Sequence, residues 1–361
     1  GRPEPERVRA LAALAGAAII ALTLVEFFVA FLLPRRVRHE PRIARLILVA
    51  GWRAWRFLAR RLPARSGDTM LGFYGPLLLL FAISLWALAL IFGFALLHWA
   101  SGSHIVRGGS GGFDDDLFFS AGGFLSASMQ LSPSTAIARA LFLGEAACGF
   151  GVLFVAIGYL PAIYQAYSRR EVTVAQLAPR AGTPPSAGAL IARSGRRGGW
   201  ADLDLYLAEW EEWAAELMET HLSYPALAYF RSQHVGENWL AALTAVLDAC
   251  AFSIAAAPEQ TEVEAAEITF SIGRHALADV SHVLRAKPGR SNPQRLGSAD
   301  FAALWELAAE SGLDLRAKDE VEPRLSELRA RYEPLVTGLS RSLELTSPSW
   351  LPPAQLEPGR A

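Results

Sequence analysis

Three consecutive aspartates form a compact group of carboxylates in this sequence. Asp114, Asp115 and Asp116 follow a glycine-rich lead and precede the largely apolar residues 117–125. Repeated around a symmetric ring, such carboxylates would raise the local concentration of cations; in a single chain they would solvate a turn. The residues alone leave both uses open.

Two further carboxylates lie inside long apolar segments, where a charged side chain is costly and therefore of functional interest. Glu26 falls within residues 10–33, and Glu145 falls within residues 140–164. Glu26 could pair with another helix or lie near the membrane interface. Glu145 could serve a function directly, but we favour a role in bracing a neighbouring helix by hydrogen bonding.

We find no pattern typical of an enzyme. His221 and His234 lack metal-ligand spacing, and Cys148 and Cys250 are too few for a disulfide framework. A glycine-rich phosphate fingerprint is missing, and the polar half of the chain is acidic, which argues against nucleic acid as a partner. We expect no catalytic residues, no metal site and no cofactor.

Three segments are long and apolar enough to cross a bilayer core of about 30 Å as helices. They are residues 10–33, 70–100 and 140–164. The first is too long for the core of a signal peptide and lacks a convincing cleavage site, so we predict a span. A fourth apolar stretch, 238–257, contains Asp248 and much alanine, which favours a buried core helix over a fourth span.

The arginines predict the orientation, because cytoplasmic loops retain positive charge. Those between the first two spans are Arg35, Arg36, Arg38, Arg42, Arg45, Arg53, Arg56, Arg60, Arg61 and Arg65. The next loop has only Arg107. We therefore expect a multi-pass protein of the cell membrane, with its N-terminus outside and its C-terminal domain in the cytoplasm.

The basic loop, residues 35–66, has helical order. Arginines gather on one face and apolar residues such as Trp52 and Trp55 fill the other. This pattern is typical of a helix in the headgroup plane, which makes membrane lipids an expected partner. A voltage sensor would need regular spacing, which the gap from Arg45 to Arg53 breaks; a solvated linker is the other alternative.

The segment between the second and third spans predicts a re-entrant helix. Residues 116–124 suit a short helix with acidic residues at its start, where the helix dipole favours them. This helix is too short to cross the membrane and lies between two spans that must run antiparallel. An entering helix with an irregular return is tolerated where protein or water covers the backbone.

The order of span, short re-entrant helix and second span resembles the two-helix pore module of potassium channels. The matching segments are 115–120, 132–135, 143–145, 158–172 and 221–234. They are similar to bacterial proteins of the two-pore-domain potassium channel family, over about residues 70–255. The resemblance implies a homotetramer, with four chains around one axis, and monovalent cations as the conducted partner.

The return from the short helix departs from that family. Its members carry a filter of the form Thr-x-Gly-Tyr-Gly-Asp, whose carbonyl oxygens replace the water around the ion. In this sequence the residues at the filter positions are Ser126, Ala127, Ser128, Met129 and Gln130, and neither filter glycine is present. We expect a cation channel with weak or absent potassium selectivity. The alternative is a non-conducting membrane scaffold or signalling protein built on the module.

The sequence thus predicts an all-α membrane protein with three transmembrane helices, a re-entrant pore helix and a cytoplasmic helical domain. The expected parts are a first span (1–34), the basic in-plane helix (35–66), a pore module (67–172), a linker (173–199), the helical domain (200–346) and a Pro-rich tail (347–361). Gly149, Gly151 and Gly158 could hinge a gate, although close helix packing is the favoured use.

Overall fold

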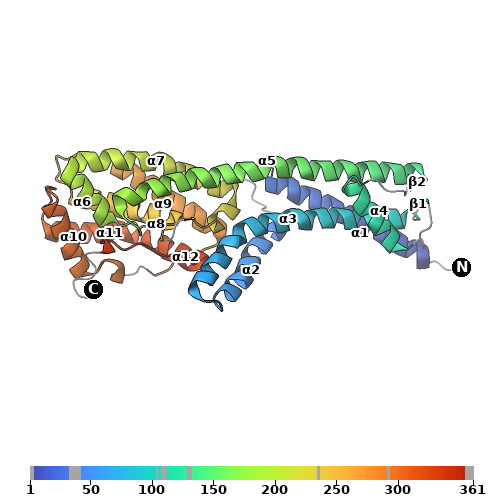
Figure 1. Cartoon of the computed structure of the whole chain (residues 1–361), viewed down its shortest axis with the longest axis horizontal. Coiled ribbons are helices and arrows are strands. Elements are labelled where there is room, and N and C mark those ends of the chain that lie inside the picture. Colours follow the sequence, from blue (N-terminus) through green and yellow to red (C-terminus); the bar gives the residue numbers. More distant parts are fainter. Residues whose placement is uncertain are drawn as a thin grey trace. The chain divides into compact units, whose positions relative to one another are not determined.

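The chain folds almost entirely into helices, as its apolar periodicity predicts. The computed structural model describes residues 4–31, 42–102, 105–106, 112–127, 132–233, 236–290 and 293–353. The chain divides into two compact units, which we call unit 1 (Gly1–Tyr164) and unit 2 (Gln165–Ala361). One long helix, α5 (Ala136–Ala181), begins in unit 1 and ends in unit 2 (Figure 1). The all-helical class is confirmed.

Unit 1 packs one short helix among long apolar ones. Its elements are α1 (Glu4–Phe31), α2 (Arg42–Ala59), α3 (Ala64–Ala100), β1 (Ile105–Val106), α4 (Phe113–Phe124), β2 (Ser132–Pro133) and the first part of α5. The strands pair antiparallel, with Ile105 opposite Pro133 and Val106 opposite Ser132. This ladder ties the end of α3 to the start of α5, so the segment that carries α4 begins and ends at neighbouring points.

Two glycines let α1 and α3 approach closely. A Cβ atom on Gly16 would lie 2.6 Å from the carbonyl oxygen of Gly93, and one on Gly93 would lie 2.7 Å from Ile20. Larger residues at either position would push the helices apart. Small residues at a crossing are the usual way in which apolar helices gain contact in a membrane.

Unit 2 is a helical domain built around one buried helix. Its further elements are α6 (Ala187–Arg197), α7 (Trp200–Ser223), η1 (Pro225–Tyr229), α8 (Trp239–Ala256), α9 (Glu264–Leu284), η2 (Pro293–Leu296), α10 (Ser298–Glu310), α11 (Lys318–Ala330) and α12 (Glu333–Leu343). Helices α6, α7, α9, α11 and α12 all contact α8. Asn238 caps α8, because its side chain accepts a hydrogen bond from the Ala241 N–H at 2.7 Å.

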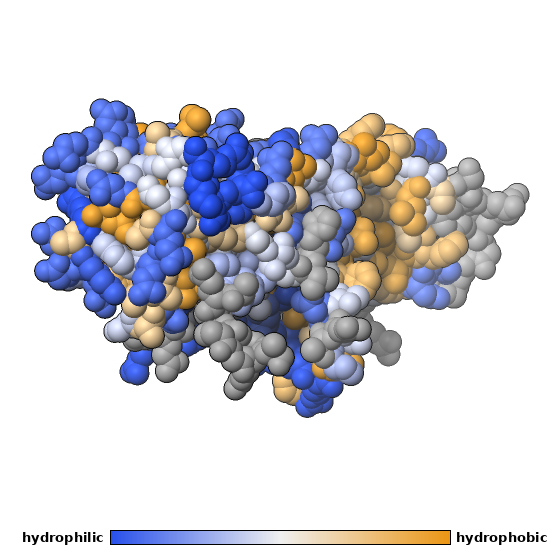
Figure 2. Space-filling view, turned by 60° about the vertical axis from the view of Figure 1, so that its left-hand side comes forward, coloured by the Kyte–Doolittle hydropathy of each residue, from blue (hydrophilic) through white to orange (hydrophobic). Residues whose placement is uncertain are grey.

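Four helices in the described part of the chain are long and apolar enough to cross a membrane: α1, α3, α5 and α8. They differ in how far the protein itself covers them, since 94% of α8 is buried against 17% of the apolar windows of α1 and α5. In Figure 2, hydrophobic residues gather on the surface of unit 1, whereas hydrophilic residues dominate the visible face of unit 2. Long apolar helices with open surfaces are compatible with a multi-pass membrane protein.

Most of the linker expected at residues 173–199 is helical. Helix α5 continues to Ala181, and α6 follows after Ser186, whose side chain accepts a hydrogen bond from the Ala189 N–H. Leu190 and Ile191 are buried. Composition is misleading here, because the arginines and glycines that suggest a linker alternate with a regular buried face.

The C-terminal part also differs from expectation. The last part of the helical domain expected at 200–346 is divided into α11 and α12, with the break at Arg331 and Tyr332. Ser298 is the first residue of α10, and Gly297 holds the cap position. The start of the expected tail packs on unit 2, since Trp350 is buried and its carbonyl accepts a hydrogen bond from Gly188.

Candidate functional site

The short helix α4 packs against α3 in unit 1. Its first turn contains the three aspartates, which the helix dipole favours at that end. Their environments differ: Asp114 is exposed, Asp115 is half-buried and Asp116 is fully buried. The three carboxylates therefore do not form one exposed acidic group, and Asp114 is the most exposed of them in a single chain.

A buried polar group joins α3, α4 and α5. The Ser120 hydroxyl on α4 lies 2.8 Å from the carbonyl oxygen of Ile91 and hydrogen-bonds Glu145 Oε1 on α5. His98, in the last turn of α3, places Nε2 3.7 Å from Glu145 Oε2. All three residues are at most 1% exposed. We call these residues the His98–Ser120–Glu145 cluster.

Aromatic rings pack around this cluster. The His98 imidazole meets the Phe119 ring edge-on at 5.2 Å between centroids, and Phe119 lies 5.4 Å from Phe142 on α5. The polar contacts are therefore enclosed by apolar groups, where a lost hydrogen bond is costly. The sequence had indicated Glu145 as a candidate site residue. Ser120 entered only as the last residue of a segment that resembles the pore module, and His98 was not singled out.

The C-terminal end of α4 is pressed against α5. A Cβ atom on Gly149 would lie 2.0 Å from the Phe124 carbonyl oxygen, so only glycine fits. A Cβ atom on Gly123 would lie 2.9 Å from Glu145 Oε2. Gly149 is about 20 Å along α5 from its start at 1.5 Å per residue. Gly151 and Gly158, in contrast, have open space where a Cβ atom would be.

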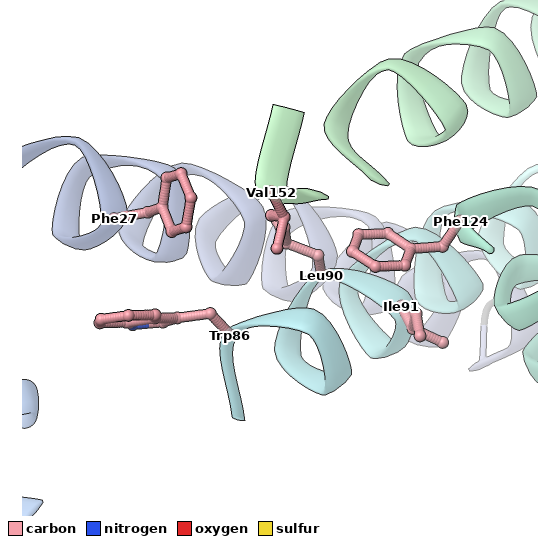
Figure 3. Packing of buried hydrophobic residues seen from close by; sticks show 6 residues of the cluster. All are labelled: Phe27, Trp86, Leu90, Ile91, Phe124 and Val152. Atoms are coloured by element: carbon pink, nitrogen blue, oxygen red, sulfur yellow. The ribbon is translucent and has the colours of Figure 1, made fainter. Parts of the chain in front are cut away.

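Six buried hydrophobic residues pack beside the end of α4. They come from α1, α3, α4 and α5 and are Phe27, Trp86, Leu90, Ile91, Phe124 and Val152 (Figure 3). Phe27 and Trp86 meet edge to face at 5.7 Å between ring centroids. The first span expected from the sequence is therefore packed against the same core as the short helix.

The residues after α4 begin with a helix-closing motif. The N–H groups of Ser126 and Ala127 donate to the carbonyls of Gly123 and Gly122, at 3.1 and 2.9 Å. This is a Schellman motif, and Ser126 occupies its left-handed position with φ 54°. The expected filter positions Ser128, Met129 and Gln130 lie outside the described residues. Glu26 is half-buried on α1.

Unit 2 has one buried group around His221. Its Nδ1–H donates to the Leu217 carbonyl at 2.8 Å, and Nε2 lies 3.3 Å from Arg170 Nη1. The same guanidinium donates to the carbonyls of Leu227 and Phe230. These contacts give His221 a packing role, while His234 lies outside the described residues.

A second buried group in unit 2 is ionic. Arg295 donates to Asp248 on α8 and, at 2.9 Å, to Glu333 on α12. The Tyr332 hydroxyl also donates to Asp248, whose side chain is fully buried. This network ties the central helix to its neighbours and accounts for Asp248 inside an apolar stretch.

No set of histidines, cysteines and carboxylates suited to a metal ion occurs within the described ranges. Comparison with known proteins does not add a functional assignment: no family model, curated protein or solved structure matches the chain. What the site can do must therefore be argued from its own geometry.

Proposed function

We propose that unit 1 is a pore module and that copies of the chain form a cation pathway across the cell membrane. The observation that carries this proposal is the position of α4. Its C-terminal end lies against Gly149, about 20 Å along α5. The β1–β2 ladder brings the two ends of the segment together. A short helix that enters and returns on one side is the form of a pore loop.

The direction of α4 supports cations as the conducted species. The C-terminal end of a helix carries the negative end of its dipole, so a cation is stabilised near it. Here that end is the deep one, next to Gly149. The His98–Ser120–Glu145 cluster holds α4 from the side, so its polar groups brace the helix rather than coordinate an ion.

One pore segment in each chain cannot enclose a path, and the proposal therefore includes a homotetramer. The first part of α5 leaves large apolar side chains exposed, which neighbouring chains or lipid would cover. They are Leu143, Phe150, Leu153, Phe154 and Ile157. In this arrangement α1, α3 and α5 span the membrane, and unit 2 with its core helix α8 lies in the cytoplasm, as the arginine distribution indicates.

The filter positions favour weak or absent selectivity for potassium over sodium. A selective filter stacks carbonyl oxygens at a fixed spacing, and the sequence lacks both glycines that such a stack uses. Ser126 belongs to the Schellman motif that ends α4. This last observation favours the second candidate function, a non-conducting scaffold or signalling protein.

Planar-bilayer recording from the purified full-length protein, with asymmetric potassium and sodium, separates these candidates. We expect currents that reverse well away from the potassium equilibrium potential. Gly149→Val should abolish these currents, because the valine side chain would displace the C-terminal end of α4 from α5. Gly151→Val, at an open position of the same helix, should retain them.

Each departure from this result has a defined meaning. Reversal at the potassium equilibrium potential would overturn the selectivity proposal. Wild-type protein that is folded and tetrameric but carries no current would favour the non-conducting scaffold or signalling protein. Native mass spectrometry that detects only monomers would remove the pore proposal itself.

A further inference from the structure

Helix α2 is a basic helix that the proposed pore leaves unexplained. It runs antiparallel along the first turns of α3. Trp52 packs on Tyr74 with ring centroids 5.0 Å apart, and Trp55 Nε1 donates to the Met70 carbonyl at 2.8 Å. Trp52 is only 4% exposed. The apolar side that the sequence assigned to lipid is therefore covered, at these residues, by α3.

The opposite side of α2 combines arginines with an exposed aromatic ring. Arg53 and Phe57 lie one turn apart on α2, and Arg60 and Arg61 follow in the turn directly after it. All four are exposed, Phe57 to 57%. The Arg61 guanidinium lies over the Phe57 ring at 4.2 Å. We call this surface the basic face of α2.

The charge of this region is uniformly positive. Residues 42–67 contain no aspartate or glutamate, and Asp68 is the first acidic residue after them. Leu58 and Leu62 are 49% and 44% exposed beside the arginines. Arginines next to exposed apolar side chains match the boundary between anionic headgroups and acyl chains.

The length of α3 places the basic face at that boundary. Residues 77–100 alone form about 36 Å of helix, enough for a bilayer core of about 30 Å. The contacts that Trp52 and Trp55 make with α3 lie before Pro76, which is inside α3. In Figure 1 the part of α3 beside α2 slopes away from the rest of the helix, and proline is a common cause of such bends.

We propose that the basic face of α2 binds the headgroups of anionic phospholipids. The arginines supply the attraction, and Phe57, Leu58 and Leu62 enter the edge of the acyl region. The tryptophans hold α2 on α3, so the arginines are presented by a helical hairpin rather than by an isolated helix. This inference requires unit 1 to be in a membrane, but it does not require conduction.

Native mass spectrometry of the full-length protein tests the proposal. The protein is equilibrated in detergent with equal amounts of phosphatidylglycerol and phosphatidylcholine, and bound lipids are counted. We expect wild-type protein to retain phosphatidylglycerol preferentially, and less of it at high ionic strength. The variant Arg53→Gln/Arg60→Gln/Arg61→Gln should bind it roughly 100-fold more weakly, at about fivefold for each arginine near an anionic surface.

Two matched variants complete the experiment. Arg196→Gln/Arg197→Gln/Arg324→Gln removes the same charge from exposed positions of unit 2 and should leave lipid binding unchanged. Arg53→Lys/Arg60→Lys/Arg61→Lys keeps the charge and should retain most binding. Equal retention of phosphatidylglycerol by the wild type and the α2 glutamine variant would overturn the proposal, as would an equal loss in the unit 2 variant.

Discussion

His98 Nε2 and Glu145 Oε2 lie 3.7 Å apart, although the two residues come from different apolar helices and are both buried. Ser120 completes the contact from α4. A buried polar group that loses its partner keeps its full desolvation cost, so His98 and Ser120 both depend on Glu145, which contacts each of them. The position of α4 should therefore be sensitive to single substitutions there.

Ser120→Ala tests this dependence. The change removes a hydroxyl from Ile91 and Glu145, and we expect a loss of about 0.5–2 kcal/mol in the free energy of unfolding. Thermal unfolding of the purified protein in detergent measures it. Ser84→Ala, at an exposed position of α3, is the control. Equal melting temperatures for the two variants would show that the cluster does not hold α4.

Gly16→Val should weaken the crossing of α1 and α3. Its Cβ atom would lie 2.6 Å from the Gly93 carbonyl oxygen, so the helices must separate. Overpacking of this kind costs about 1–3 kcal/mol. Ala15→Val, one position away on the exposed side, provides the control for melting experiments in detergent. A Gly16→Val protein as stable as Ala15→Val would exclude the close crossing.

The ionic network of unit 2 should contribute far more to the free energy of unfolding than surface ion pairs do. Asp248→Ala removes one of the two buried carboxylates that Arg295 contacts and the buried acceptor of the Tyr332 hydroxyl, which costs about 3–5 kcal/mol. Glu327→Gln removes an exposed ion pair with Arg331 and should cost less than about 0.5 kcal/mol. Hydrogen exchange of α8 amides compares the two, and similar protection in both variants would contradict the expectation.

His221 should make unit 2 less stable in acid. Burial, reinforced by the charge of Arg170, lowers the pKa of His221 from 6.5 to about 3. Between these values the unfolded chain binds a proton that the folded chain does not. Stability therefore falls as the pH drops from about 6.5 towards 3, by at most about 1.4 kcal/mol per pH unit.

Urea unfolding of the full-length protein in detergent between pH 7 and pH 4.5 measures this slope. His221→Gln cannot take up a proton and should flatten it, whereas His275→Gln, at an exposed position, should leave it unchanged. An unchanged slope in His221→Gln would assign the acid sensitivity to other groups.

The apolar segments show which features of the fold can be predicted from sequence patterns. Hydropathy and length placed α1, α3 and α5 and identified α8 as a core helix, because these properties are local to one segment. The contacts of His98 and Ser120, and the closeness of Gly149 to Phe124, are set by how different helices meet. No pattern within one segment carries that information, so they became visible only in the structure.

The pairing of β1 with β2 also has a consequence for experiments on topology. It closes a loop from Ile105 to Pro133, and the entropy of loop closure rises slowly with length. Doubling such a loop costs only about 0.6 kcal/mol. A short epitope inserted among residues 107–111 should therefore leave unit 1 folded. Antibody access to that epitope in intact cells would then report directly which side of the membrane the ladder faces.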